Sequence, residues 1–310
     1  MNEVNLVNWM KLTRVPKLGP KRILNLFSIF KSIENVVSAS DADLIRTRVF
    51  TEEMVSEWNK LKDVSDDNFY KAIDECKKHD IQIITIFDDI YPENLKRVPY
   101  PPLTLFLKGD ISLLNTNKVA VVGSRESDEH AKDWAYKNSQ IIAKNNLTVI
   151  SGGAIGIDTM AHKGALSVNG KTICVLGTGF FKMYPEENND LFREILEKGL
   201  FVSEHLPNFP GSRISHIQRN RITSGLANAL IMVASGEKGG SMVQTKMAFE
   251  QRVPIFCPKK SLNLQPNTGL TQVINEWKGK EIDTVIEVID CAIQNKKSNE
   301  NIESLQRFMT

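Results

Sequence analysis

Four short segments of this sequence suit phosphate binding, because each contains glycines, small polar side chains or arginines in close succession. They are Gly123-Ser124-Arg125, Ser151-Gly152-Gly153 with Gly156 and Asp158, Arg219-Asn220-Arg221, and Gly239-Gly240-Ser241. Glycine lets backbone N–H groups approach an anion, a hydroxyl adds a short donor, and a guanidinium binds two phosphate oxygens at once. Each segment alone is also explained as a capped turn at the start of a helix. Four together favour one shared anion site.

The third segment can bind phosphates through both of its arginines only in some backbone conformations. Arg219 and Arg221 are separated by one residue and cannot share one face of a helix. They contact successive phosphates, together with Arg125, only if the stretch forms a turn or the start of a helix. The alternative is an exposed basic turn.

Motifs for common catalytic chemistries are absent from the sequence. It contains no P-loop lysine motif, no His-Glu-x-x-His and no nucleophile elbow. Asp158 and His162 are one helical turn apart, and a contact that stabilises the helix start is the more common explanation for such a pair. Glu204-His205 is similarly ambiguous. We assign no catalytic role to either pair and expect a protein that is not an enzyme and uses no metal or cofactor.

A nicotinamide dinucleotide is also disfavoured. The glycines at 152, 153 and 156 do not match the dinucleotide-binding motif, and the acidic residue expected about twenty positions later is missing.

The elements that must position these segments follow from the apolar pattern. Short apolar runs alternate with helical stretches from about residue 80, which indicates a parallel sheet buried on both faces. Predicted strands are 81–86, 103–107, 119–122, 148–150, 172–176, 200–203, 229–233 and 254–256, with helices over 128–144, 157–167, 190–197, 217–224 and 241–250. This order implies right-handed crossovers and ligand binding at the carboxyl ends of the strands.

Three parts are expected along the chain. Helical spacing predicts a small helical domain over residues 1–72, followed by a Rossmann-like α/β domain over 73–285. Residues 286–310 should form a C-terminal helix and a polar, mobile tail. Val15–Arg22 looks like the hairpin of a helix-hairpin-helix unit, although a tight turn between packed helices is equally compatible.

Composition narrows the class of protein. The chain has 310 residues, of which 41% are hydrophobic and 25% charged, with a formal net charge of +2 that neither requires nor excludes a nucleic-acid partner. Its four cysteines lack the spacing of metal or disulfide frameworks, so buried free thiols are expected. No apolar stretch reaches membrane-spanning length, and the N-terminus is polar. We expect a soluble, cytoplasmic protein without a membrane partner.

The order of the motifs resembles the DNA-processing protein A family (DprA, also called Smf). The resemblance covers Leu12–Phe30, Tyr91-Pro92-Glu93-Asn94-Leu95, Pro101–Asp110, Val119–Arg125, Ser151–His162, Gly170–Gly179, Tyr184–Asn188, Ser203-Glu204, Arg219–Ile222 and Gly240–Gln251. It implies an extended Rossmann fold behind a sterile-alpha-motif-like helical domain, a homodimer, single-stranded DNA binding, and delivery of the recombinase RecA in natural transformation.

Family binding residues carry over where the motif is kept. They are Gly123, Ser124, Arg125, Ser151, Gly152, Lys171, Arg219, Asn220, Arg221, Gly240 and Ser241, to which the glycine-rich turn adds Gly153 and Gly156. The family pattern Leu-Ala-Arg-Gly is replaced by Gly153-Ala154-Ile155-Gly156, so one basic group is lost at the expected crevice. The family's Val-Pro-Gly after the last strand is replaced by Cys257-Pro258-Lys259, and Lys259-Lys260 are candidates to compensate for the lost charge. No winged-helix segment is expected.

Two other classes compete with a DNA-binding mediator. One is a nucleotide-derivative enzyme or sensor related to lysine-decarboxylase-like phosphoribohydrolases, but the segment starting at Lys238 lacks the Pro-Gly-Gly-x-Gly-Thr pattern of those enzymes. The other is a purely structural interaction protein, which gives no reason for four phosphate-type segments. The sequence therefore favours single-stranded DNA binding and leaves transformation, general recombination and defence open as roles.

Overall fold

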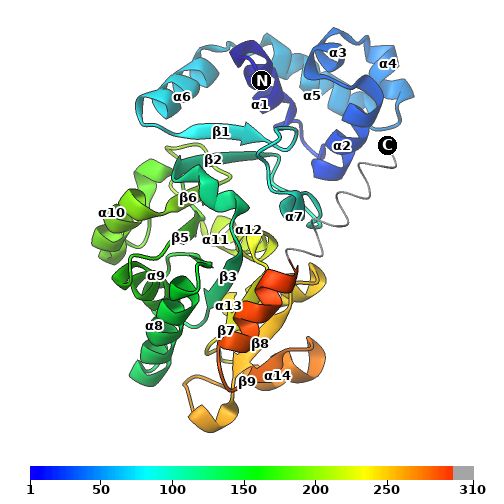
Figure 1. Ribbon diagram of the computed structural model, residues 1–310. Helices are drawn as coiled ribbons and strands as arrows, with labels where there is room; N and C mark the ends of the chain where they lie inside the picture. Colours follow the sequence, from blue (N-terminus) through cyan, green and yellow to red (C-terminus); the bar gives the residue numbers. More distant parts are fainter. Residues whose placement is uncertain (296–310) are drawn as a thin grey trace.

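The computed structural model describes residues 1–295, and Figure 1 shows a group of helices stacked against one end of a long sheet. The group consists of α1 (Glu3–Leu12), α2 (Pro20–Phe30), α3 (Ile33–Ser38), α4 (Asp41–Arg46), α5 (Glu52–Asp63) and α6 (Asp67–Lys78). The predicted N-terminal helical part is therefore present. It extends past the expected boundary, because residue 72 lies inside α6.

Local signals in the sequence explain where these short helices begin. Ser32, Ser40 and Thr51 each accept a hydrogen bond from the backbone N–H three residues later, which satisfies a donor that the first helical turn leaves free. The apolar faces of the helices enclose Trp9 and Trp58, which are both fully buried. Helices this short are marginal alone, so this packing is what stabilises them.

Nine strands of the described residues form one sheet, in the order β1-β2-β6-β5-β4-β3-β7-β8-β9. They are β1 (Gln82–Thr85), β2 (Thr104–Gly109), β3 (Lys118–Val122), β4 (Thr148–Ser151), β5 (Thr172–Leu176), β6 (Leu200–Ser203), β7 (Ala229–Met232), β8 (Ile255–Pro258) and β9 (Lys280–Ile282). All pairs among β3 to β9 are parallel. The predicted Rossmann-like α/β fold is confirmed.

The sheet differs from the prediction at its two ends. β1 and β2 pair antiparallel, and β2 is also antiparallel to β6. The connection between β1 and β2 contains only the short helix α7 (Glu93–Lys96), not the long crossover that a parallel pair needs. The apolar pattern does not predict β9, because two of its three residues, Lys280 and Glu281, are charged.

Helices cover both faces of the sheet. On one face lie α8 (Glu129–Lys144), α9 (Ile157–Ser167), α10 (Asn189–Lys198) and the helical residues 286–295, and on the other lie α12 (Asn220–Leu226) and α13 (Gly240–Glu250). The chain also forms α11 (Arg213–Gln218) and α14 (Leu270–Glu276). The single helix expected over 217–224 is divided at Arg219, which ends α11 and begins α12.

The order of the strands reverses beside β3. This strand pairs with β4 on one side and with β7 on the other. The chain leaves β3 toward α8 and leaves β7 toward α13, which lie on opposite faces of the sheet (Figure 1). Connections that diverge in this way leave a crevice at the carboxyl ends of the strands.

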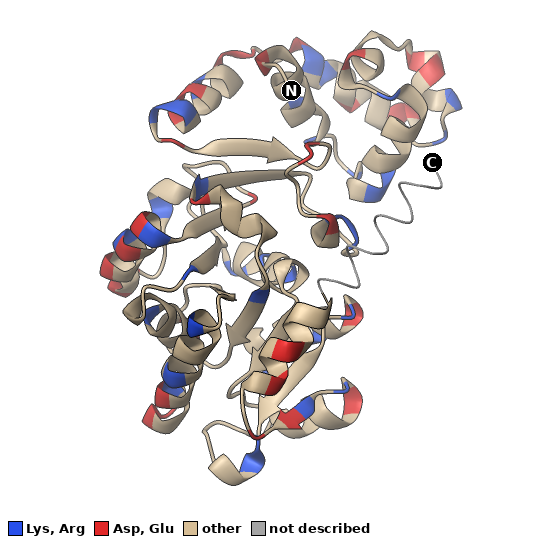
Figure 2. Cartoon of the chain, viewed as in Figure 1, with Lys and Arg blue, Asp and Glu red and all other residues tan. Residues whose placement is uncertain are grey.

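The outer surface of the described residues carries charges of both signs. Figure 2 shows that basic and acidic residues alternate along outer helices such as α6, α8 and α10. Within residues 1–295, no helix is both long and apolar enough to span a bilayer. All four cysteines are unpaired, three of them buried and Cys291 partly buried, as predicted. The polar tail predicted after residue 295 lies outside the described residues.

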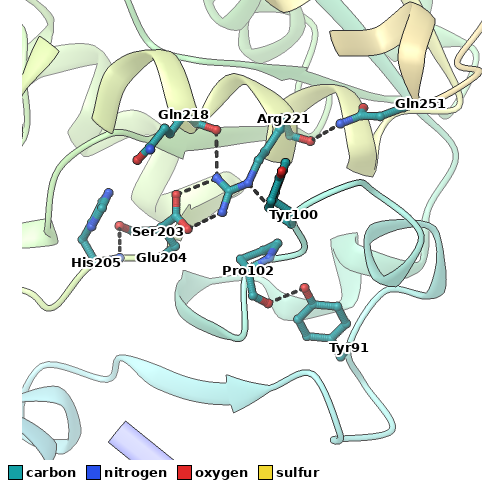
Figure 3. A network of polar contacts seen from close by, with 9 residues as sticks. All are labelled: Tyr91, Tyr100, Pro102, Ser203, Glu204, His205, Gln218, Arg221 and Gln251. Carbon is teal, nitrogen blue, oxygen red and sulfur yellow. Dashed lines mark hydrogen bonds and ion pairs between the residues drawn. The ribbon is translucent and has the colours of Figure 1, made fainter. Parts of the chain in front are cut away.

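The connection between β1 and β2 ties the antiparallel end of the sheet to α12. Tyr91 is buried, and its hydroxyl donates a 2.6 Å hydrogen bond to the carbonyl oxygen of Pro102 (Figure 3). Further along, Val98 packs against Gly225 of α12, where an added Cβ would lie 2.7 Å from Val98 Cγ1. The antiparallel end therefore supports the helix that follows Arg219.

We predict that Tyr91→Phe lowers the free energy of unfolding by about 1–2 kcal/mol, because it leaves the buried Pro102 carbonyl without its donor. Urea unfolding measures this change. Tyr100→Phe is the matched control: that side chain is 69% exposed, so its hydroxyl should matter by less than about 0.5 kcal/mol. Equal losses of stability in the two variants would contradict the structural role of Tyr91.

Candidate functional site

A cleft of about 620 Å³ opens at the carboxyl ends of β3, β4 and β7. Its walls come from the loops after these three strands and from α11 and the start of α12. The charged side chains that line it are Arg125, Arg213, Arg219, Lys238, Glu126 and Asp158. Three of the four predicted segments contribute lining residues directly, and the glycine-rich turn contributes Ala154 and Asp158. The cleft thus lies at the predicted edge of the sheet.

The turns after β3 and β4 pack backbone against backbone. Gly156 has a φ of +88°, and an added Cβ would lie 2.5 Å from the carbonyl oxygen of Ser124. The N–H of Ile157 donates to that same oxygen at 3.3 Å. Only glycine tolerates both this conformation and this approach. The contact fixes the turn that presents Arg125, whose side chain is exposed at the cleft.

Arg219 lies at the floor of the cleft and is only 5% exposed. Its guanidinium rests on the backbone of Gly152, where an added Cβ would fall 1.5 Å from Nη1. Nε and Nη1 are buried without a hydrogen-bond acceptor, and no ion pair of Arg219 occurs within residues 1–295. A buried guanidinium with unused donors is costly, and an anion in the cleft would offset that cost.

Two titratable groups beside Arg219 have shifted pKa values. Asp158 is buried, and its Oδ2 accepts hydrogen bonds from the N–H groups of Gly152 (3.1 Å) and Ala154 (3.4 Å). Burial raises the pKa of Asp158, which the charge of Arg219 opposes. Burial, with the charges of Arg219 and Arg125, lowers the pKa of His216 to about 4. His216 is therefore neutral near pH 7 and adds no positive charge.

The turn after β7 contributes the start of a helix. Gly239 precedes the first turn of α13, which has no side-chain cap and no acidic residue. The N–H groups of such a turn remain available to an anion. The hydroxyls of Ser241 and Ser235 lie 2.9 Å apart, and the amide of Asn220 donates to the carbonyl oxygen of Gly240 at 3.3 Å. These bonds join the turn to the start of α12.

Several predicted binding residues do not line the cleft, among them Ser151, Gly153 and Lys171. Ser151 is fully buried and donates to the carbonyl oxygen of Val121 at 2.8 Å, so its hydroxyl is structural. Gly153 lies against the side chains of Cys174 and Phe192. Lys171 directly precedes β5 and so lies at the amino ends of the parallel strands, away from the cleft. It forms a 3.6 Å ion pair with Asp110.

Lys259 and Lys260 do not replace the lost basic group. Lys259 pairs with Asp283 at 2.5 Å, and Lys260 donates to Thr271. Neither residue lines the cleft. The added cations are Arg213 and Lys238, to which the sequence assigned no role. Both residues lie close in sequence to predicted segments, and this is the one feature of the sequence that could have pointed to them. Closeness in sequence does not show where a side chain points.

Arg221 does not line the cleft beside Arg219 in this structure, because its side chain lies against Glu204 (Figure 3). That both arginines contact successive phosphates stays a prediction. Arg221 forms two bonds to the carboxylate of Glu204, at 2.7 and 2.6 Å. Its Nε donates to the carbonyl oxygen of Tyr100 at 2.7 Å, and Nη1 also donates to that of Gln218. The guanidinium therefore joins α12 to the loop after β6 and to the segment before β2. We call this set the Arg221 network.

The two suspected acid–base pairs have structural explanations. His162 bonds through Nδ1 to the hydroxyl of Thr172 at 2.7 Å and not to Asp158, so the predicted contact is wrong. Burial lowers the pKa of His162 to about 3. His205 stacks on Phe209 at 4.3 Å, while its neighbour Glu204 belongs to the Arg221 network. Within the described part of the chain, no group of His, Cys, Asp or Glu side chains is arranged to hold a metal ion.

This architecture defines a class: a Rossmann-like α/β protein with a cationic cleft at the point where the strand order reverses. The chain belongs to the DNA recombination-mediator protein A family, whose model matches residues 82–292. The resemblance predicted from the motifs is confirmed.

Known relatives agree with this assignment. Protein Smf of Synechocystis sp. is 31% identical over 275 residues, which are 86% of this chain and 68% of that protein. DNA processing protein DprA of Streptococcus pneumoniae is 36% identical over 192 residues, which are 62% of this chain and 68% of that protein. DNA processing protein DprA of Bacillus subtilis is 34% identical, over 60% of this chain and 63% of that protein.

Two solved structures share the fold. The X-ray structure of DNA processing protein A from Streptococcus pneumoniae aligns with a TM-score of 0.78 and 28% identity, over 94% of this chain and 98% of that one. The Helicobacter pylori protein, described for its single-stranded DNA binding mode, aligns with a TM-score of 0.62 and 27% identity, over 69% of this chain and 97% of that one.

We predict that Glu204→Gln lowers the free energy of unfolding by about 2 kcal/mol, because it leaves the charge of Arg221 without its carboxylate in a largely buried place. Both side chains are 16% exposed. Asp190→Asn is the control, since its pair with Arg193 is exposed and should contribute less than about 1 kcal/mol. Chemical denaturation compares the two. If Glu204→Gln costs no more than the control, Arg221 is not held by this network and returns as a candidate phosphate ligand.

Proposed function

We propose that the cleft binds the phosphates of single-stranded DNA without strong sequence preference. The observation that carries this proposal is the buried guanidinium of Arg219, which has unused donors at the floor of a cleft that Arg125 and Lys238 also line. Guanidinium groups and helix N-termini contact phosphates, which carry no sequence information. The Helicobacter pylori relative, described as binding single-stranded DNA, supports this choice of ligand.

Single strands suit this cleft better than a duplex. The groups that line it lie in a concavity at the carboxyl ends of the strands, and within residues 1–295 no helix projects from it to enter a major groove. A single strand can bend its backbone into such a concavity, while a duplex cannot. Each neutralised phosphate releases counterions, so the affinity should fall steeply with salt.

We further propose that the protein acts in the cytoplasm, binds DNA as a homodimer, and passes the strand to a RecA-type recombinase during natural transformation or recombination. The support is the family to which the chain belongs, named for recombination mediation. Light scattering at tens of micromolar tests the dimer: a monomer alone would contradict it. ATP-dependent filament formation by a recombinase on strands coated with this protein tests delivery.

Binding without turnover is part of the proposal. The phosphoribohydrolase pattern has an acidic residue after its glycine-rich loop, and Glu250 is the first acidic residue after the corresponding segment that starts at Lys238. Glu250 lies at the far end of α13 and lines a different cavity, of about 410 Å³. Nucleoside monophosphates and DNA should therefore remain intact on incubation. Hydrolysis that disappears in Glu250→Gln would favour the enzyme.

Arg125→Ala should weaken binding of fluorescent oligo-dT and leave the melting temperature nearly unchanged, because an exposed guanidinium contributes little to folding. The slope of log affinity against log salt should fall by about 0.7 for each phosphate that the variant no longer neutralises. Arg125→Lys should restore part of the affinity, since an ammonium keeps the charge but not the two-pronged geometry. Fluorescence anisotropy over a salt series measures affinity and slope, and thermal unfolding measures the melting temperature.

Arg193→Ala is the control for this series, because Arg193 is 75% exposed on α10 and does not line the cleft. It should bind oligo-dT like the parent. If Arg125→Ala also keeps the parental affinity and salt slope, the turns at the cleft are structural and the DNA site lies elsewhere on the protein.

A further inference from the structure

We propose that the floor of the cleft is a site for a phosphate monoester, namely the terminal phosphate of a DNA strand or the phosphate of a free nucleoside monophosphate. The inference rests on the proposed function and specifies the ligand of the same site. Three observations carry it: the position of Arg219, the charge balance of the cleft, and the space beside the guanidinium.

Arg219 is placed where a terminal phosphate can reach it with fewer constraints than an internal one. Only 5% of the residue is exposed, and the guanidinium lies against the backbone of Gly152. A phosphodiester inside a strand is flanked by two nucleosides, and both would have to enter the cleft with it. A monoester has a nucleoside on one side only and can enter phosphate first.

The charges in the cleft match a dianion. Its lining contains four cationic and two anionic side chains, a net of two positive charges when all are ionised. His216 does not alter this balance near pH 7, because its pKa is lowered to about 4. A phosphate monoester carries about −1.5 to −2 at pH 7, whereas an internal phosphodiester carries a single negative charge. The monoester therefore neutralises the cleft more completely.

The anionic side chains do not block the floor. Oδ2 of Asp158 already accepts the N–H groups of Gly152 and Ala154, and Asp158 does not line the space beside the Arg219 guanidinium. Glu126 is exposed, and water can screen its charge. An incoming phosphate thus meets the guanidinium of Arg219 and the uncapped start of α13.

The space beside Arg219 has the size of one oxygen atom. A recess of about 20 Å³ lies between Arg219, Gly152, Arg125 and His216. A volume of about 10–15 Å³ on this measure is enough for one water molecule. One phosphate oxygen fits there, and the remaining oxygens and the nucleoside occupy the larger cleft, whose volume is typical of small-ligand sites.

The test uses the full chain and internally labelled oligo-dT of one length in three forms: with a 5′-phosphate, with a 3′-phosphate, and with hydroxyls at both ends. We expect one phosphorylated form to bind at least tenfold more tightly than the hydroxyl form. In parallel, dTMP and thymidine are compared as competitors and as stabilisers in thermal unfolding. We expect dTMP, and not thymidine, to compete and to raise the melting temperature.

Arg219→Lys should reduce the preference for phosphate, that is, the ratio of the affinities of the phosphorylated and hydroxyl forms, because the shorter ammonium keeps a charge but does not fill the guanidinium position. Arg219 belongs to the DNA cleft, so binding of the hydroxyl form should weaken as well and serves as the reference within each variant. If this variant fails to fold, the comparison of dTMP with thymidine on the parent protein still decides the matter. A gain with one strand end identifies that end as the ligand, and a response to dTMP alone identifies the free nucleotide.

Equal binding of all three oligonucleotides, with no response to dTMP, would overturn the monoester site and leave the proposed DNA binding intact. Failure of every oligonucleotide to bind, together with stabilisation by dTMP, would have the opposite meaning: the monoester site would stand and the proposed function would fall.

Discussion

The site depends on one costly feature, a guanidinium removed from water before any anion reaches it. Arg219 is held in that state by the surrounding backbone, since it forms no ion pair with any residue that the structure describes. Gly152 supplies the surface on which it rests, and Arg219 itself lies at the junction of α11 and α12, both of which contribute residues to the cleft. Because the cation is already desolvated and fixed, little ordering remains to be done when a phosphate arrives.

The break between α11 and α12 is itself supported from a distance. The Arg221 network holds the first turn of α12 against the loop after β6 and the carbonyl of Tyr100 (Figure 3). Tyr91 and Val98 stabilise the segment that contributes this carbonyl. The antiparallel end of the sheet therefore has a role in the cleft although none of its residues lines it. Two arginines one residue apart have different tasks: Arg219 faces the cleft, and Arg221 positions the helix that follows it.

Apolar patterns predicted most of the sheet, since strands such as β5 and β6 are uninterrupted runs that only a buried position explains. The direction of an edge strand depends on how the chain connects it to its neighbour, and β9 forms because it pairs with β8. A short apolar run in the sequence therefore predicts neither feature. The site was predicted as turns but not as side-chain directions. The contrast between Arg219 and Arg221 is set by Glu204 and by the carbonyl of Tyr100, which are remote in sequence.

The lost basic residue of the glycine-rich turn shows how the cleft keeps its charge. Ile155 occupies part of that turn and is 43% exposed, close to Tyr184, which is 52% exposed. Arg213 and Lys238 bring cations to the same cleft from α11 and from the turn after β7. The positive charge is therefore spread over the walls, while the turn presents an apolar surface beside an aromatic ring. An exposed apolar side chain beside an aromatic ring is the kind of surface on which nucleobases stack, so under the proposed function this turn would meet bases and not phosphates.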